Sequence, residues 1–146
     1  MADPQSRSTP PGDSPASSGA TTRLTTKTST RSVAETVAHL RSLAEGKGMK
    51  VFAVIDHSGE AERAGLDLRE TKVVIFGSPQ AGTPVMAAAP CAALDLPLKV
   101  LVWSDDGQTK VTYTAPAALA TRYDLNEELA ARLAGIDGLT DALVGG

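Results

Sequence analysis

The stretch that decides the fold runs Val73-Val-Ile-Phe-Gly-Ser-Pro-Gln-Ala-Gly-Thr-Pro-Val-Met86. Its first four residues form an apolar run, which predicts a buried strand that ends at Phe76. The Gly- and Pro-rich residues that follow predict a loop, after which Thr83 is expected to cap a helix with Pro84 at its first position. Loops at strand ends often carry functional sites, so this segment indicates where a site would lie.

Strands and helices are predicted to alternate before this segment. Residues 23–30 are Thr-rich, which favours a first strand. Ser32 and Glu35 form a capping-box pattern, and the helix that follows is expected to end at Gly46. Residues 51–55 predict a strand covered on both faces. A short helix capped by Ser58 should then lead to the strand at 71–76.

The second half predicts a short helix at 84–89, a strand at 98–103 and a hairpin. Asp106-Gly107 is a strong hairpin signal, and residues 108–114 alternate as the second strand of the hairpin should. Two helices follow, one with Pro116 at its first position and one capped by Asn126. Gly135 is expected to end the last substantial helix, leaving at most one more turn after it.

This order of elements favours an α/β or α+β fold. We expect residues 21–146 to form one compact domain, with a mixed sheet of about five strands, helices packed against it and a late hairpin. Residues 1–20 are rich in Pro, Ser and Gly and carry no apolar period. A segment of that composition cannot bury enough surface to fold, so we predict a disordered N-terminal tail.

Composition excludes several classes of function. The chain of 146 residues has a formal charge of −3, which gives no electrostatic support for nucleic-acid binding. No apolar run is long enough to span a bilayer and no secretory leader is visible, so no membrane association and a cytoplasmic location are expected. Cys91 is the only cysteine, which excludes an internal disulfide, and its apolar surroundings predict burial.

The residues that could carry chemistry are few. His57 follows a strand, and histidine is the side chain most easily poised near neutral pH. The loop at 77–86 has neither the Lys of a P-loop nor a dinucleotide fingerprint, although its backbone could hold an anion. No spacing of His, Cys or acidic residues indicates a metal site, and no cofactor is identified. We expect one candidate ligand pocket, formed by His57, Gly77, Ser78, Gly82, Thr83 and Met86.

Four motifs in order resemble a known family. They are Ile55-Asp-His57, Ala64-Gly-Leu-x-Leu-Arg69, the stretch Ile75–Met86, and Asp95-Leu-Pro-Leu-Lys-x-Leu-Val-Trp103. Together they resemble the domain of unknown function family numbered 302, over residues 22–144. The resemblance implies a compact α/β domain that often pairs as a homodimer, without an established reaction. Ser78 and Gln80 depart from the family pattern, which has Asn and often Lys there.

Three functional hypotheses remain open from the sequence. The first is a binding or interaction domain, homodimeric, which holds a small-molecule ligand near His57 and the loop at 77–86. The second is an enzyme that uses His57 as a general acid or base beside an anion-holding loop. The third is a structural partner subunit without a ligand. The sequence does not decide whether the protein is an enzyme.

Overall fold

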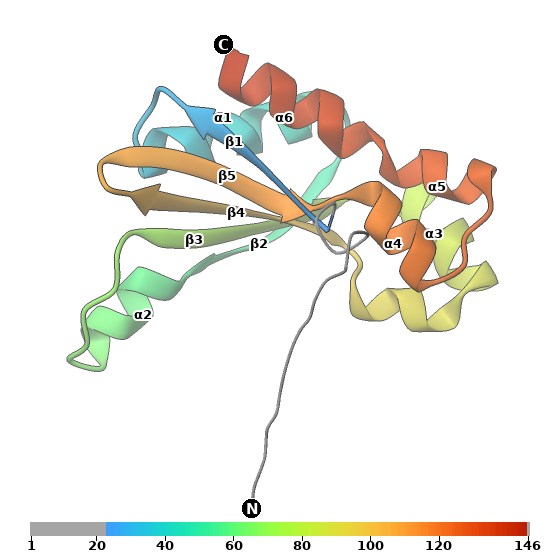
Figure 1. Cartoon of the computed structure of the whole chain (residues 1–146), viewed down its shortest axis with the longest axis horizontal. Coiled ribbons are helices and arrows are strands. Elements are labelled where there is room, and N and C mark those ends of the chain that lie inside the picture. Colours follow the sequence, from blue (N-terminus) through green and yellow to red (C-terminus); the bar gives the residue numbers. More distant parts are fainter. Residues whose placement is uncertain (1–22, 146) are drawn as a thin grey trace, which may run out of the picture.

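The computed structural model describes residues 23–145, and Figure 1 shows their arrangement. The predicted tail at 1–20 lies outside the described residues. The helices and strands follow one another in the order β1 (Leu24–Ser29), α1 (Val33–Gly46), β2 (Lys50–Asp56), α2 (His57–Arg63), β3 (Thr71–Gly77), α3 (Pro79–Ala88), the 3-10 helix η3 (Pro90–Leu94), β4 (Leu98–Asp105), β5 (Gln108–Thr114), α4 (Pro116–Arg122), α5 (Glu127–Leu133) and α6 (Gly135–Gly145).

The strands form one five-stranded sheet in the order β1-β5-β4-β3-β2. The α+β fold, the strand number and the late hairpin are confirmed, but the expected mixed sheet is wrong because every neighbouring pair is antiparallel. The reason is the path of the chain. Helix α1 carries it from one edge of the sheet to the other, so β1 and β2 never become parallel neighbours.

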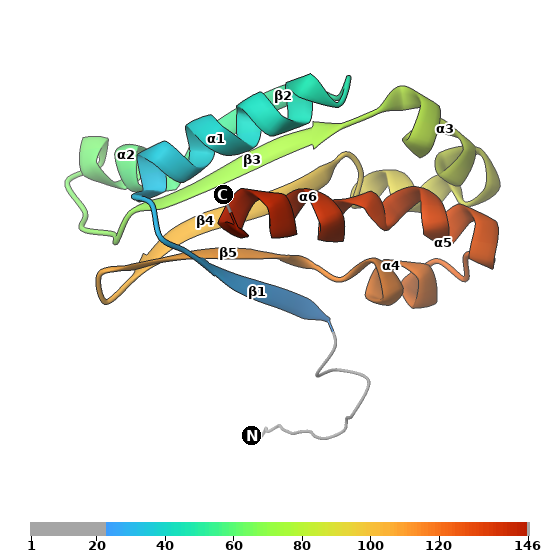
Figure 2. The same ribbon diagram turned by 90° about the horizontal axis from the view of Figure 1, so that it is seen from above.

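Two helices cover one face of the sheet. Figure 2 shows α1 and α6 lying across the strands on the same side. Alternate strand residues point to this side and bury the main core with both helices. That core consists of Val33, Val37, Leu40, Ala44, Val74, Phe76, Val100, Val102, Val111, Tyr113, Ile136, Leu139 and Leu143.

The opposite face of the sheet has no helix over its centre in the part of the chain that the structure describes (Figure 1). The prediction that β2 is covered on both faces is therefore wrong. Phe52 and Ile55 are 47% and 38% exposed. An apolar run can come from a strand with one open face, because the run itself does not record which residues are covered.

The C-terminal helix α6 was not predicted. Gly135 was expected to end the last substantial helix of the chain, but it is the first residue of α6. Ile136, Leu139 and Leu143 recur at helical spacing and are all buried in the main core. Burial of this stripe stabilises the helix despite Gly138 in its second turn, which costs up to about 1 kcal/mol relative to alanine.

A polar cluster attaches α6 to the sheet. The Lys27 Nζ donates to the Asp137 carbonyl at 3.0 Å and to the Thr140 Oγ1 at 2.6 Å, and pairs with the Asp141 Oδ1 at 2.8 Å. The Tyr113 hydroxyl donates to the Asp137 carboxylate. Burial opposes the charge on Lys27, yet its bonds to Asp141 and Tyr113 raise the pKa of this amine above its ordinary value.

Replacing Lys27 with methionine should lower the free energy of unfolding by about 1.5–3 kcal/mol, because the hydrogen bonds from one charged donor to α6 are lost together. Urea unfolding at neutral pH measures this difference. Lys110→Met is the matched control, since the Lys110 amine donates to Thr28 at an exposed position. The control should change stability by less than about 0.5 kcal/mol, and an equal loss in both variants would contradict the role assigned to Lys27.

Several local predictions are confirmed. Ser32 and Glu35 form the capping box of α1, and the Asn126 side chain accepts from the Leu129 N–H at the start of α5. At the hairpin, Asp106 and Gly107 have φ values of 51° and 86°, the left-handed pair that a type I′ turn requires. These signals involve residues close in sequence, so neighbouring elements do not disturb them.

A second, smaller core lies beyond one end of the sheet. Helices α3, α4 and α5 pack there with η3, as Figure 2 shows. Its buried residues are Val85, Ala92, Leu119 and Leu133. Leu98, at the start of β4, packs against both cores. The end of the sheet that carries Gly77 therefore contacts a layer of helices. This sheet end and the helices border a cavity.

Candidate functional site

Helix α3 begins earlier than its sequence indicated. Ser78 is the N-cap residue and Pro79 occupies the first helical position, so the prediction that Thr83 caps the helix is wrong. Pro84 lies inside the helix and cannot donate to the Gln80 carbonyl four residues before it. The Arg132 guanidinium, from α5, donates to that carbonyl at 3.4 Å. A contact distant in sequence thus supports the interior proline.

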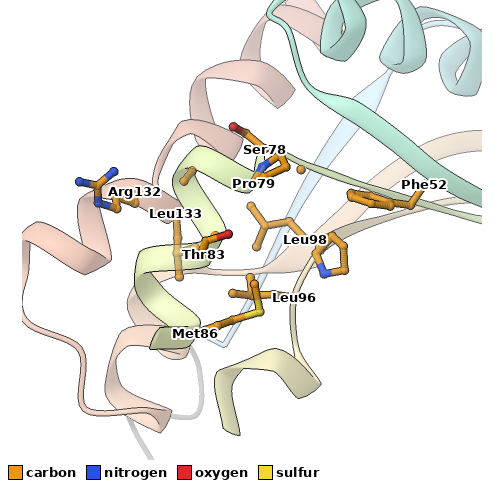
Figure 3. A pocket seen from close by; sticks show the side chains of 13 residues that line it. Phe52, Ser78, Pro79, Thr83, Met86, Leu96, Leu98, Arg132 and Leu133 are labelled. Atoms are coloured by element: carbon orange, nitrogen blue, oxygen red, sulfur yellow. The ribbon is translucent and has the colours of Figure 1, made fainter. Parts of the chain in front are cut away.

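A cavity of about 200 Å³ lies between α3, α5 and the end of the sheet. Figure 3 shows the side chains of β2, α3, α5 and the segment before β4 that surround it. Apolar side chains and glycine backbone make up most of the lining. The complete set is Phe52, Gly77, Ser78, Pro79, Ala81, Gly82, Thr83, Met86, Leu96, Pro97, Leu98, Arg132 and Leu133.

Three lining residues carry polar groups, and they differ in where those groups lie. The Thr83 hydroxyl points from α3 toward Leu98, across the cavity (Figure 3). The Ser78 hydroxyl donates to the Gln80 Oε1 at 2.9 Å. The Arg132 guanidinium lies on the far side of α3 from Leu98 (Figure 3) and is 3.8 Å from the Glu128 carboxylate. The interior is therefore apolar, with one hydroxyl facing into it.

Two glycines bear on the shape of the cavity. A Cβ on Gly77 would lie 3.4 Å from the Pro97 Cβ, so the small residue permits β3 to end close to the segment before β4. A Cβ on Gly82 would lie 3.7 Å from the Met86 Cε, which is an ordinary contact. A longer side chain at Gly82 would extend into the cavity. A substitution at Gly82 can therefore change the free volume of the cavity.

His57 lies far from this cavity. Strand β2 pairs with β3 so that Lys50 is beside Gly77 and Asp56 is beside Lys72. The seven residues of β2 separate the two ends by roughly 20 Å, and His57 follows Asp56 at the end remote from Gly77. The expectation of one pocket holding both His57 and the loop is therefore wrong. Strands β2 and β3 run in opposite directions. The residues that follow β2 and the residues that follow β3 therefore lie at opposite ends of the sheet.

The N-cap of α2 is also different from the prediction. Asp56, rather than Ser58, caps this helix, because its carboxylate accepts from the Gly59 N–H and the Ser58 hydroxyl, each at 2.9 Å. The bond from Gly59, followed by that from Ser58, lowers the pKa of Asp56 below its ordinary value. His57 is exposed at the first position of α2.

The remaining five residues of the predicted pocket do come together. Gly77, Ser78, Gly82, Thr83 and Met86 all line the cavity. Sequence reasoning missed the rest of the lining because it comes from elsewhere in the chain, notably Phe52 and Leu133. Leu96 and Leu98 belong to a motif that carried the family resemblance and predicted a strand, but they were not predicted to line the pocket. Cys91, expected to be buried, is exposed.

Asp95 fixes the segment that forms one wall of the cavity. Its carboxylate accepts from the Tyr123 hydroxyl and from the Arg122 guanidinium, the latter at 2.8 Å. The Tyr123 bond is the main cause that lowers the pKa of Asp95, with Arg122 adding to it against the effect of burial. Leu96 and Pro97, joined by a cis peptide bond, follow directly and line the cavity.

Asp95→Asn should lower the free energy of unfolding at pH 7 by about 1–2 kcal/mol, because charge-assisted bonds to α4 are weakened. The folded-state pKa of Asp95 is below its unfolded value. Its contribution is therefore complete above the ordinary pKa of 3.8 and is lost as the pH falls through the folded-state value. Urea unfolding at pH 7 and pH 3 measures this, and the stability difference between the two proteins should shrink at pH 3. A difference that is unchanged by pH would contradict the assignment.

Residues 23–145 contain neither a cluster of metal-ligating side chains nor a helix able to span a membrane. No three His, Cys, Asp or Glu side chains gather there as a metal site would require. None of the helices in that range combines the length and the apolar character needed to cross a bilayer.

Comparison with known proteins assigns the chain to a family. Residues 25–143 match the family model described as domain of unknown function DUF302. The chain belongs to this family, for which no function is established. A crystal structure of an uncharacterized conserved protein DUF302 from Bacillus stearothermophilus has the same fold. It aligns with a TM-score of 0.72 and 20% identity, over 84% of this chain and 95% of that one.

Part of the chain is also similar to longer proteins. A fluoride-specific ion channel FluC 1 of Brucella suis is 43% identical over 94 residues, which are 64% of this chain and 37% of that protein. A FluC 1 of Brucella abortus gives the same identity over 35% of its length. The chain thus matches little more than a third of the length of these relatives.

Proposed function

We propose that this protein binds a small, mainly apolar molecule in the cavity beside α3. One observation carries the proposal. The cavity of about 200 Å³ lies between two packed cores. Its lining is apolar except where Thr83, Ser78 and Arg132 contribute polar groups. Ligand sites are typically concave and apolar, with a few polar groups that orient the ligand.

The ligand chemistry follows from the lining. Leu98, Leu133 and Met86 offer contacts without hydrogen bonds, so the body of the ligand is apolar. Methionine suits such a site because its side chain adapts to the shape of the ligand. The Thr83 hydroxyl can donate to or accept from one polar group. We therefore propose a ligand of about six to ten non-hydrogen atoms with one polar end, a size suggested by the volume a water-sized molecule occupies.

The enzyme hypothesis is less well supported than binding. It required His57 beside the loop at 77–86, whereas the two lie at opposite ends of β2. The cavity lining has Arg132 as its one ionisable side chain, and arginine does not exchange protons near neutral pH. General acid–base catalysis needs a titratable group within hydrogen-bond reach of the reacting atom.

We also propose that the protein is a homodimer, as the family resemblance implies, and retain a cytoplasmic location as a prediction. The exposed apolar side chains on the uncovered face of the sheet support association, because such patches commonly mark interaction surfaces. The Brucella relatives suggest that a domain of this kind can be joined to other proteins. That occurrence favours a binding or interaction module.

Native mass spectrometry of the protein purified from cells tests ligand binding. We expect an additional mass of roughly 80–150 Da per chain, as about six to ten non-hydrogen atoms give, that is lost when the protein is denatured. The denatured spectrum is the control, since it separates a bound molecule from a covalent modification. A protein that carries no additional mass, and that also fails to bind a small apolar alcohol, would contradict the proposal.

A further inference from the structure

The face of the sheet opposite α1 and α6, called here the open face, has a continuous central row. The strand register places five residues side by side, one from each strand. This central row is Ile55, Val73, Leu101, Thr112 and Thr26. The row is apolar on β2, β3 and β4 and carries threonines on β5 and β1. Small or apolar residues thus cross the whole width of the sheet.

The rows on either side of it complete a patch of apolar residues, threonines and two lysines. Ala53, Ile75 and Lys99 lie side by side in one flanking row, and Thr71, Trp103 and Lys110 in the other. Trp103 is half-buried, with its indole N–H bonded to the Thr112 hydroxyl at 3.0 Å. The patch therefore presents a fixed aromatic ring beside aliphatic side chains.

Charge is distributed unequally along the strands of the open face. Lys50 and Lys99 lie toward the end that carries Gly77. Charged residues of both signs gather at the other end, where Figure 1 shows α2 projecting beyond the sheet on the side away from α1 and α6. Asp105 ends β4 there, 3.7 Å from the Arg69 guanidinium, and Glu62, Asp67 and Glu70 line one hollow together with Lys72. The Gly77 end thus carries lysines, and the other end carries charges of both signs.

We propose that a second copy of this chain covers the open face, with a two-fold axis along the central row. The inference rests on the proposed homodimer and specifies its surface. Rotation about that axis places β2, β3 and β4 of one copy over the same strands of the other, so the apolar halves meet. It also reverses the strand direction, which brings the Gly77 end of each copy, with Lys50 and Lys99, over the end of the other copy that carries Asp105. An isologous interface requires this kind of self-complementarity.

The dimensions of the open face fit such a dimer. Five strands at about 4.8 Å spacing and seven residues at about 3.3 Å give roughly 24 by 23 Å. Side-chain relief and α2 add to this area, so the accessible surface approaches the ~800 Å² per partner of a standard interface. Aligned packing of two twisted sheets is a common arrangement.

Phe52 connects this surface to the cavity. Its strand is irregular there, since the pairing shifts between Val51 and Ala53. The Phe52 side chain lines the cavity and is also one of the exposed large apolar groups of β2. The second copy would cover this side chain, so the dimer interface and the cavity rim share one residue.

The central row allows a specific test, because a residue on a two-fold axis faces its own copy. Leu101→Lys and Leu101→Glu should each weaken dimerisation by at least about 100-fold, since like charges then oppose each other. An equimolar mixture should restore a heterodimer, since the Lys of one variant then faces the Glu of the other. Sedimentation velocity over a concentration series measures all three, with circular dichroism confirming that each variant is folded. Ala38→Lys is the control, because Ala38 is exposed on α1, on the other side of the sheet from the open face.

The possible outcomes test the proposed surface and the existence of the dimer separately. Loss of the dimer in each variant with recovery in the mixture supports the axis. If the wild type is a dimer and both Leu101 variants remain dimers, the proposed surface is wrong but the homodimer itself stands. Dimer loss without recovery in the mixture overturns the axis along the central row. A wild-type protein that is monomeric at every concentration overturns the homodimer and this inference together.

Discussion

Gly82→Leu should abolish binding of a small apolar probe while leaving the protein at least as stable as the wild type. The new side chain would extend past Met86 into the cavity of about 200 Å³ and occupy much of its volume. Leucine is also a better helix former than glycine, which favours α3 by up to about 1 kcal/mol. We expect the dissociation constant for 1-hexanol to rise at least about 30-fold, the equivalent of ~2 kcal/mol of lost affinity.

Gly82→Ala is the matched control for this variant. Its Cβ would make an ordinary contact with Met86 and leave most of the cavity open. The control should share the gain in helix stability and retain probe binding within a few-fold. Thermal denaturation and a binding titration of all three proteins measure both effects. Equal binding by the Leu and Ala variants would contradict the placement of the ligand.

Phe76→Ala should have the largest effect on stability among the single changes considered. Phe76 is 1% exposed and lies in the main core on β3, where α1 and the sheet meet. Removing a buried phenyl ring leaves a cavity and costs about 3–5 kcal/mol. Domains of this size are typically stable by only 5–15 kcal/mol. We expect the melting temperature to fall by roughly 10–20 °C.

Phe52→Ala provides an internal comparison, because the chain has only these two phenylalanines. Phe52 lies on the neighbouring strand and is 47% exposed. Its removal should cost less than about 1 kcal/mol in the monomer. Urea unfolding of both variants, at a protein concentration where sedimentation shows monomers, gives the comparison. Similar losses at the two positions would contradict the assignment of one covered and one open face.

Signals that act within a few residues were predicted well. The capping box at Ser32, the N-cap at Asn126 and the turn at Asp106 depend on neighbouring residues alone. The strand at 71–76 was also predicted, because its apolar run is short and bounded by loop residues. These elements were sufficient to predict five strands and an α+β domain.

The start of α3 shows where local signals stop being decisive. Ser78-Pro79 and Thr83-Pro84 are both acceptable helix starts, since each places a small polar residue before a proline. The structure uses the first pair. A bond from Arg132 to the carbonyl of Gln80 supports the second proline inside the helix, and that residue comes from more than 50 positions away.

The candidate site could be predicted only in part for a similar reason. Loop residues from Gly77 to Met86 are continuous in sequence, so they were found together. Phe52 and Leu133 reach the same cavity from β2 and α5, and their periodicity indicates only that they lie on an apolar face. The predicted position of His57 was wrong because a single sequence does not reveal the order and direction of the strands.

The most direct test of ligand binding uses the methionine methyl groups as reporters. The chain has three methionines, and of these Met86 lines the cavity whereas Met49 packs against the main core. A carbon-13 methyl spectrum would be recorded during titration with 1-hexanol, and Met86→Leu would assign the signal. We predict that the Met86 signal shifts saturably, with Kd on the order of 1 mM or below, while the Met49 signal stays in place. A Met86 signal that does not move, or one that moves equally in Gly82→Leu, would contradict a ligand site in this cavity.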